Sequence, residues 1–237
     1  MATDTPTEPT PTEKPAPHPR SAQDKKQARD IAAAGQTLRS VIADAGSDQA
    51  IGAALTEGGY PVEELQRGLD GQEAAQAALA QHLAVGGSKD AANKAYAAAE
   101  KALTTFYLNL RGLARSAFLK DRDALEKLGI SGVAPRSLGD LINASETLIR
   151  NAPLPLYVDK LTRRGVTAVK LQNLQTRLDA LREADRVQED AKSAVPSATT
   201  ERNAAAAQLN AWLVEFKAFA KVQFKDQPDV LKRWGIK

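Results

Sequence analysis

Residues 106–130 of this chain recur in similar form, without a gap, as residues 212–236. Every position pairs with its counterpart at a constant offset of 106 residues. The residues that recur unchanged are Ala114, Phe118, Asp123, Leu125, Gly129 and Ile130. This repetition indicates an internal duplication, so we expect the chain to fold as two similar halves.

The repeated stretch has the periodicity of a helix that packs on one side. Its apolar residues step by three and four positions, which places them on one stripe of a helix. The first copy has Leu103, Phe106, Leu110, Leu113 and Ala117, and the second has Leu209, Trp212, Phe216, Phe219 and Gln223. Because the stripe stays largely apolar while its residues change, packing against another helix explains the pattern better than catalysis does. The glycines Gly129 and Gly235 then suit a helix that ends in a left-handed residue.

Weaker echoes extend the duplication over most of the chain. Residues 161–172 repeat features of residues 55–66 at the same offset, and residues 140–148 repeat those of residues 30–38 at an offset of 110. The change of offset places a shortening of four residues in the second half, near Pro153. A length change in a connection leaves helix packing intact.

The composition favours helices throughout. Much of the apolar fraction is alanine, which favours helix, and aromatic residues make up only 5% of the chain. No run of alternating β-branched residues predicts a strand. We therefore predict an all-α, internally duplicated up-and-down bundle with pseudo-twofold symmetry. The bundle is expected to cover residues 23–237, with repeat 1 at about 28–130 and repeat 2 at about 137–236.

Several helix boundaries follow from breaking residues. The first helix is expected near residues 30–43. The helix that begins after Pro61 is expected to stop at Gly86 and Gly87, and its successor to cover about residues 90–120. In the second half, the long helix is expected to fade near Pro196, since proline removes a helical hydrogen bond.

The first residues and the overall composition indicate where in the cell the protein is expected. Residues 1–22 are rich in Pro, Thr and Glu, which predicts a disordered arm. The chain has no cysteine, and it shows neither the apolar segment of a signal peptide nor a run long enough to cross a bilayer. A soluble, cytoplasmic protein without stable membrane insertion is the resulting expectation.

Two pairs of motifs resemble those of a group of uncharacterised bacterial all-helical proteins with a duplicated half. One motif is G-x-x-x-x-x-L-Q, at residues 59–66 and 165–172. The other is A-[RK]-x-x-F…D-x-L-x-x-[LW]-G-I, at residues 114–130 and 220–236. The resemblance covers nearly everything after residue 30 and implies a helical fold, with no established activity to carry over.

The residues needed for catalysis or metal binding do not gather in the sequence. The two histidines, His18 and His82, lack a second histidine at metal-binding spacing and are expected to be solvated. The chain has no Glu-x-x-His pair of the di-iron bundles, no phosphate-binding glycine loop and no cysteine nucleophile. We therefore expect neither enzymatic activity nor a cofactor or metal.

A basic pair that occurs in both halves is the candidate site. Arg111 and Arg115 return as Lys217 and Lys221, each pair spaced by four residues and turned away from the apolar stripe. Such a ridge could bind an anion or a nucleic-acid backbone, but charged helical faces are usually only solvated. Residues 28–130 carry a net charge of −2 and the remainder +5, an asymmetry that could orient a partner or draw the two halves together.

Three functions stay open from the sequence. The leading hypothesis is a structural or protein-interaction module. The first alternative is a nucleic-acid or polyanion binder that uses the basic pairs. The second is a membrane-active helical bundle, suggested by aromatic residues clustered near the end of the sequence, although core packing explains these residues better. The sequence leaves the oligomeric state open.

Overall fold

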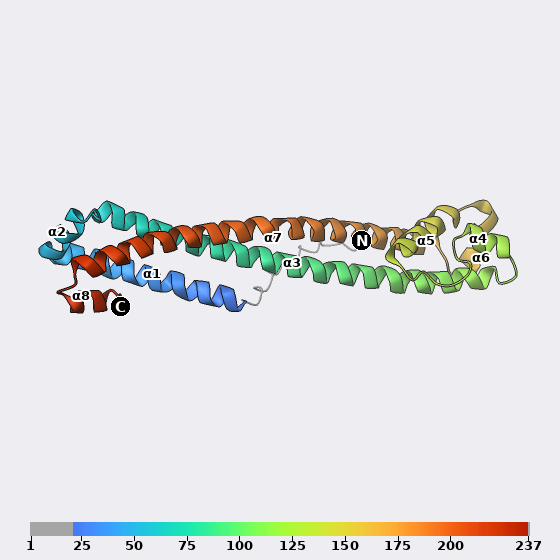
Figure 1. Cartoon of the computed structure of the whole chain (residues 1–237). Helices are drawn as coiled ribbons and strands as arrows, with labels where there is room; N and C mark the ends of the chain where they lie inside the picture. The colour runs from blue at the N-terminus through green and yellow to red at the C-terminus, as the bar shows by residue number, and fades with distance from the viewer. Residues whose placement is uncertain (1–20, 237) are drawn as a thin grey trace, which may run out of the picture. The chain divides into compact units, whose positions relative to one another are not determined.

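The computed structural model of the chain describes residues 21–236, and these residues form helices and connections without a strand. The all-α prediction is therefore confirmed for this part of the chain. Its eight helices are α1 (Ala22–Ser47), α2 (Gln49–Glu57), α3 (Val62–Ala117), α4 (Arg122–Lys127), α5 (Leu138–Asn151), α6 (Pro155–Arg163), α7 (Ala168–Gln223) and α8 (Pro228–Arg233) (Figure 1).

Three pairs of helices have equal lengths at the offset of 106 residues. Both α3 and α7 have 56 residues, both α2 and α6 have nine, and both α4 and α8 have six. The remaining pair differs, because α1 has 26 residues and α5 has 14. The connection that contains Pro153 follows α5, near the place where the sequence indicated a shortening.

The chain divides into two compact units that cut across the predicted repeats. Among the described residues, unit 1 takes residues 21–88 and 193–236, whereas unit 2 is Lys89–Lys192. Unit 1 therefore holds α1, α2, the first part of α3, the last part of α7, and α8. Unit 2 holds α4, α5, α6 and the other parts of α3 and α7. The repeat boundaries at about 28–130 and 137–236 stay a prediction about the sequence.

In unit 1, α1 packs along α3 and α7. One apolar cluster joins Ile31 of α1 to Leu79 of α3 and Leu209 of α7. A second cluster lies where α2 and α8 meet these helices, and it buries Phe216, Phe224 and Trp234. The aromatic residues near the end of the sequence therefore pack in the core of unit 1.

A glycine in unit 1 makes room for an indole. A Cβ placed on Gly68 of α3 would come within 2.7 Å of the Trp212 ring, which is closer than real Cβ contacts. Gly71, one turn further along the same helix, has no heavy atom within 4 Å of the corresponding position. Gly68 therefore allows a close approach of α3 and α7, whereas Gly71 serves no such contact.

In unit 2, α4, α5 and α6 pack against the other parts of α3 and α7. Its core buries Tyr107, Leu148 and Leu174 almost completely. Phe118, from the repeated stretch, meets Tyr157 of α6 edge to face with ring centroids 5.7 Å apart. This geometry is one of the favoured arrangements of aromatic pairs.

Three expected helix boundaries are wrong. Helix α1 begins at Ala22 rather than near residue 30, because Ser21 caps it. Helix α3 continues through Gly86 and Gly87, and α7 continues through Pro196. Glycine costs about 1 kcal/mol and proline about 3 kcal/mol inside a helix, and apolar burial on neighbouring turns can offset such costs.

The structure bears on the membrane prediction but not on most of the predicted disordered arm. Within the described residues, no helix is both long and apolar enough to cross a membrane. The predicted disordered arm, residues 1–22, lies outside the described residues except for Ser21 and Ala22, which belong to the start of α1.

Candidate functional site

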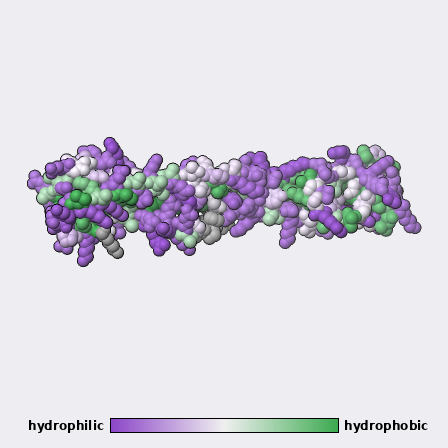
Figure 2. Space-filling view, in the orientation of Figure 1, coloured by the Kyte–Doolittle hydropathy of each residue, from purple (hydrophilic) through white to green (hydrophobic). Residues whose placement is uncertain are grey.

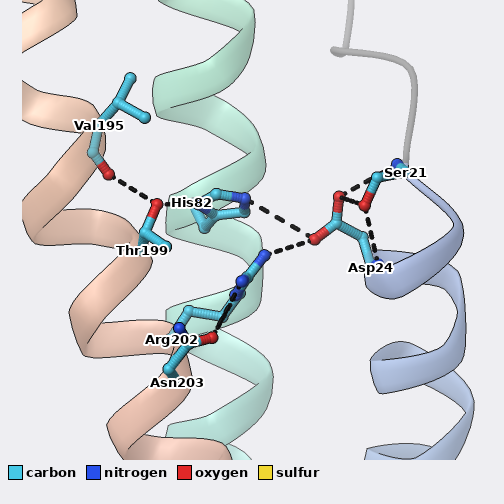
Figure 3. Close-up of polar contacts among 7 residues, drawn as sticks. All are labelled: Ser21, Asp24, His82, Val195, Thr199, Arg202 and Asn203. Carbon is cyan, nitrogen blue, oxygen red and sulfur yellow. Dashed lines mark hydrogen bonds and ion pairs between the residues drawn. The ribbon is translucent and has the colours of Figure 1, made fainter.

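Unit 1 contains a buried polar cluster that begins at the N-terminus of α1 (Figure 3). Ser21 caps the helix by accepting a hydrogen bond from the backbone amide of Asp24 at 3.1 Å. The Asp24 carboxylate in turn accepts hydrogen bonds from the backbone amide and the hydroxyl of Ser21. This reciprocal capping box satisfies donors that a helix start otherwise leaves unpaired.

An arginine from α7 neutralises the buried carboxylate. Arg202 Nη1 lies 2.6 Å from Asp24 Oδ1, and the two side chains are only 6% and 4% exposed. Arg202 also donates to the side-chain oxygen of Asn203. An unpaired charge at such depth would be costly, so the two residues depend on each other.

The histidine of α3 completes the cluster. His82 Nε2 lies 3.7 Å from Asp24 Oδ1, and His82 Nδ1 lies 3.5 Å from the Thr199 hydroxyl oxygen. The His82 side chain is 17% exposed, so the prediction of a solvated histidine is wrong for this residue. It failed because the residues that surround His82 are distant in the sequence. His18 lies outside the described residues.

The surroundings of Asp24 favour its charged form. Burial raises the pKa of the carboxyl, but the hydrogen bonds from Ser21 and the charges of Arg202 and His82 outweigh it, so the pKa lies below the ordinary value of 3.8. Asp24 therefore stays ionised at neutral pH and fastens the start of α1 to α3 and α7.

The order of hydroxyl, imidazole and carboxylate in this cluster superficially matches a nucleophilic triad. The Thr199 hydroxyl, however, donates to the backbone carbonyl of Val195 at 2.8 Å. The carboxylate is already paired with Arg202, which would weaken its ability to orient the imidazole. This geometry suits a fastening between helices rather than an activated nucleophile.

The predicted basic pair in unit 2 contacts the loop that follows α4. Arg111 Nη2 donates to the carbonyl oxygens of Ser131 and Gly132, at 3.3 and 2.7 Å. Arg115 Nη1 donates to those of Ile130 and Gly132, at 3.1 and 2.7 Å. Both guanidinium groups thus hold backbone acceptors of their own unit.

The corresponding pair in unit 1 has different surroundings. Lys221 is exposed and Lys217 is half-buried, and neither forms an ion pair with any residue of 21–236. The two pairs, which the sequence marked as possible anion-binding residues, therefore differ in how much of their charge is already in use. The structure brings Arg111 and Arg115 together on one loop.

Unit 2 also presents apolar side chains that the sequence reasoning missed. Helix α6 buries Tyr157 and Leu161, while Leu154, Leu156 and Val158 are 47%, 70% and 37% exposed. We call the last three residues the α6 surface. In Figure 2 the hydrophobic residues visible on unit 2 are interspersed with hydrophilic ones. The run of apolar residues around Pro153 and Pro155 was the signal that could have revealed it.

Neither a metal cluster nor a known relative adds to these sites. The described part of the chain contains no group of three or more His, Cys, Asp or Glu residues arranged to hold a metal ion. Comparisons with known protein families, with curated proteins and with solved structures find no match to this chain.

Proposed function

We propose that the protein is a non-enzymatic helical module that binds another protein through unit 2, and that it acts in the cytoplasm. The α6 surface supports this proposal, because Leu154, Leu156 and Val158 expose apolar area at the start of α6, with Leu156 and Val158 on either side of the buried Tyr157. Isolated surface leucines are common, whereas a local group of exposed apolar side chains is typical of an interaction site.

The local fold keeps these side chains in place. Tyr157 and Leu161 anchor α6 to the core of unit 2, and Pro155 begins the helix. The burial of Tyr157 and Leu161 fixes which side of α6 faces the core and leaves Leu156 and Val158 exposed. Leu156 and Val158 would lose exposed apolar area on binding, which is favourable by about 25 cal/mol per Å².

We further propose that the fold arose by duplication and retains approximate twofold symmetry. Equal helix lengths at the offset of 106 support this idea. So do two similar contacts after the short helices. Thr37 of α1 donates to the backbone carbonyl of Trp234, and Thr147 of α5 lies against Gly129. Thr37 and Thr147 are counterparts in the sequence, at the offset of 110 residues.

Site-specific photo-crosslinking tests the proposed function. A photoreactive residue at position 156 should yield a discrete crosslinked protein in the native cell, whereas one at exposed Glu183 of the same unit should not. Equal labelling from both positions, or none from position 156, would count against an interaction through the α6 surface. The Glu183 position controls for random collision.

The polyanion-binding alternative retains support from unit 1. Lys217 and Lys221 form no ion pair within residues 21–236, whereas Arg111 and Arg115 hold loop carbonyls. Salt-sensitive retention on heparin should therefore fall on Lys217→Ala with Lys221→Ala. A full-length protein that passes through heparin at low salt would exclude this function.

A further inference from the structure

We propose that the protein the α6 surface binds is a second copy of this chain, and that it docks on a hollow in unit 1 of that copy. This inference rests on the proposed function, because it names the partner of the same surface. It follows from two observations: an apolar hollow beside α2 and opposite charges around the two sites.

The hollow lies between α2 and the start of α3. It encloses about 620 Å³, and its lining includes Leu55, Tyr60, Val62 and Leu65. Val62 is 56% exposed and lines the hollow together with apolar residues and with Gln49, Thr56 and Glu57. An apolar side chain that entered this hollow would cover area that water now contacts, which favours binding.

The hollow in unit 1 includes one of the three positions that match the α6 surface of unit 2. At the offset of 106 residues, Leu156 matches Ala50 and Val158 matches Gly52. Gly52 lines the hollow, and Val158 is one of the exposed apolar residues of α6. The smallness of Gly52 serves the contact with α1, because a Cβ there would lie 2.7 Å from the Ala45 carbonyl oxygen. The third position of the α6 surface, Leu154, matches Asp48.

The charges around the two sites are opposite. Residues 40–66, which include α2 and the hollow, hold five acidic residues and no basic one. Residues 150–170, which include α6, hold five basic residues and one acidic residue. The acidic set is Asp44, Asp48, Glu57, Glu63 and Glu64, and the basic set is Arg150, Lys160, Arg163, Arg164 and Lys170.

Much of this charge is available to a partner. Asp44 and Glu64 are paired within unit 1, with Arg233 and Arg67. Asp48 caps α2 by accepting from the backbone amides of Ala50 and Ile51, and Lys160 lies over the Phe118 ring, 5.3 Å from its centroid. The six others form no ion pair within residues 21–236: Glu57, Glu63, Arg150, Arg163, Arg164 and Lys170. Complementary potentials of this kind steer association and fix the orientation of partners.

The same charges exclude the symmetric alternative. Two α6 surfaces facing each other would bring two basic sets together, and like charges at an interface oppose association. The contact is therefore heterologous, from unit 2 of one copy to unit 1 of the next. A heterologous contact leaves one free surface of each kind at the ends of the assembly, so growth continues unless a ring closes.

Charge-reversal variants of the full chain test the proposal by sedimentation velocity at low salt. The wild type should form dimers and larger species as its concentration rises. Arg163→Glu with Arg164→Glu, or Glu57→Lys with Glu63→Lys, should each lower the association constant by at least about 100-fold, since like charges then face each other. Far-UV circular dichroism establishes that each variant is folded.

Mixing the two variants gives the decisive result. The first variant has an intact acidic hollow and a reversed, acidic α6 surface, and the second has an intact basic α6 surface and a reversed, basic hollow. In an equimolar mixture both kinds of contact between unlike variants again join opposite charges, so association that each variant lacks alone should return, with dimers and larger species. Lys94→Glu with Lys101→Glu changes the net charge equally at exposed positions of α3 away from α6. This control should associate like the wild type.

Three results would overturn the inference: a wild type that stays monomeric at every concentration, unimpaired association of the hollow variant, or a mixture that forms no dimer. A monomeric wild type that still crosslinks a different protein through position 156 would refute the second copy as partner and leave the proposed function standing. Absence of both self-association and crosslinking would refute both.

Discussion

The buried pair of Asp24 and Arg202 should contribute more to stability than any other polar contact described for unit 1. The perturbation is Asp24→Ala, which removes the carboxylate and leaves the guanidinium of Arg202 buried without its partner. Asp24 is 3% exposed and Arg202 is 5% exposed, so water cannot readily solvate the guanidinium that remains.

The expected magnitude follows from this burial. Removing one partner of a buried ion pair destabilises a fold by about 3–5 kcal/mol. Asp140→Ala provides the matched control, because Asp140 bonds to Ser137 in the same Ser-x-x-Asp geometry at the start of α5 but is exposed and lacks an arginine. Losing the one exposed hydrogen bond from the Ser137 hydroxyl to the Asp140 carboxylate should cost only about 0.5–1.5 kcal/mol.

Urea unfolding followed by far-UV circular dichroism measures both changes. Fluorescence adds a selective readout, since the only two tryptophans of the chain, Trp212 and Trp234, belong to unit 1. The double variant Asp24→Ala with Arg202→Met should lose less than the sum of the single changes, with a coupling of about 1–3 kcal/mol.

The reasoning has a clear point of failure. If Asp24→Ala costs no more free energy of unfolding than Asp140→Ala, the buried pair does not fasten α1. Strict additivity in the double variant would lead to the same conclusion, because it would mean that the two charges do not interact.

Three further predictions test other parts of the structure. Because the pKa of Asp24 is lower in the folded state than in the unfolded state, the charged carboxylate stabilises the fold above its ordinary pKa, and this stability is lost as the pH falls through the folded-state pKa. Asp24→Asn should therefore reduce the dependence of the free energy of unfolding, measured in urea, on acidic pH. An unchanged pH dependence would show that Asp24 is not its source. Gly68→Ala should destabilise unit 1 by about 1–3 kcal/mol through overpacking against the indole, whereas Gly71→Ala should stabilise it by up to about 1 kcal/mol; equal urea midpoints would refute the close approach. Arg111→Ala should speed hydrogen exchange in residues 130–132 by freeing the loop, and unchanged exchange would show that its hydrogen bonds do not hold the loop.

The spacing of apolar residues predicted where helices form, but glycine and proline were poor predictors of where the helices end. The stripe through Phe106 and its counterpart Trp212 lies on helices, as its spacing indicated. Gly86, Gly87 and Pro196 were interpreted as helix ends, yet α3 and α7 run through them. A breaking residue costs a fixed local free energy, and whether burial elsewhere on the helix offsets that cost depends on neighbours that the local sequence does not specify.

The sites were harder to predict than the helices. Arg111 and Arg115 stood out because they recur, but their acceptors are carbonyl oxygens, which any residue provides. The pair of Asp24 and Arg202 could not be inferred, since the two residues are 178 positions apart and each resembles an ordinary helical surface residue. Chain topology alone brings them together.

The sequence by itself determined the helical character of this protein and the offset of 106 residues, because periodicity and repetition are both visible in the order of residues along the chain. Only the tertiary structure decided which segments share a core. Unit 1 combines the start of the chain with the segment after residue 193, and unit 2 takes what lies between. The physical reason is that an apolar stripe requires a partner without specifying which one, and the burial of His82 and the exposure of Leu156 both depend on that choice.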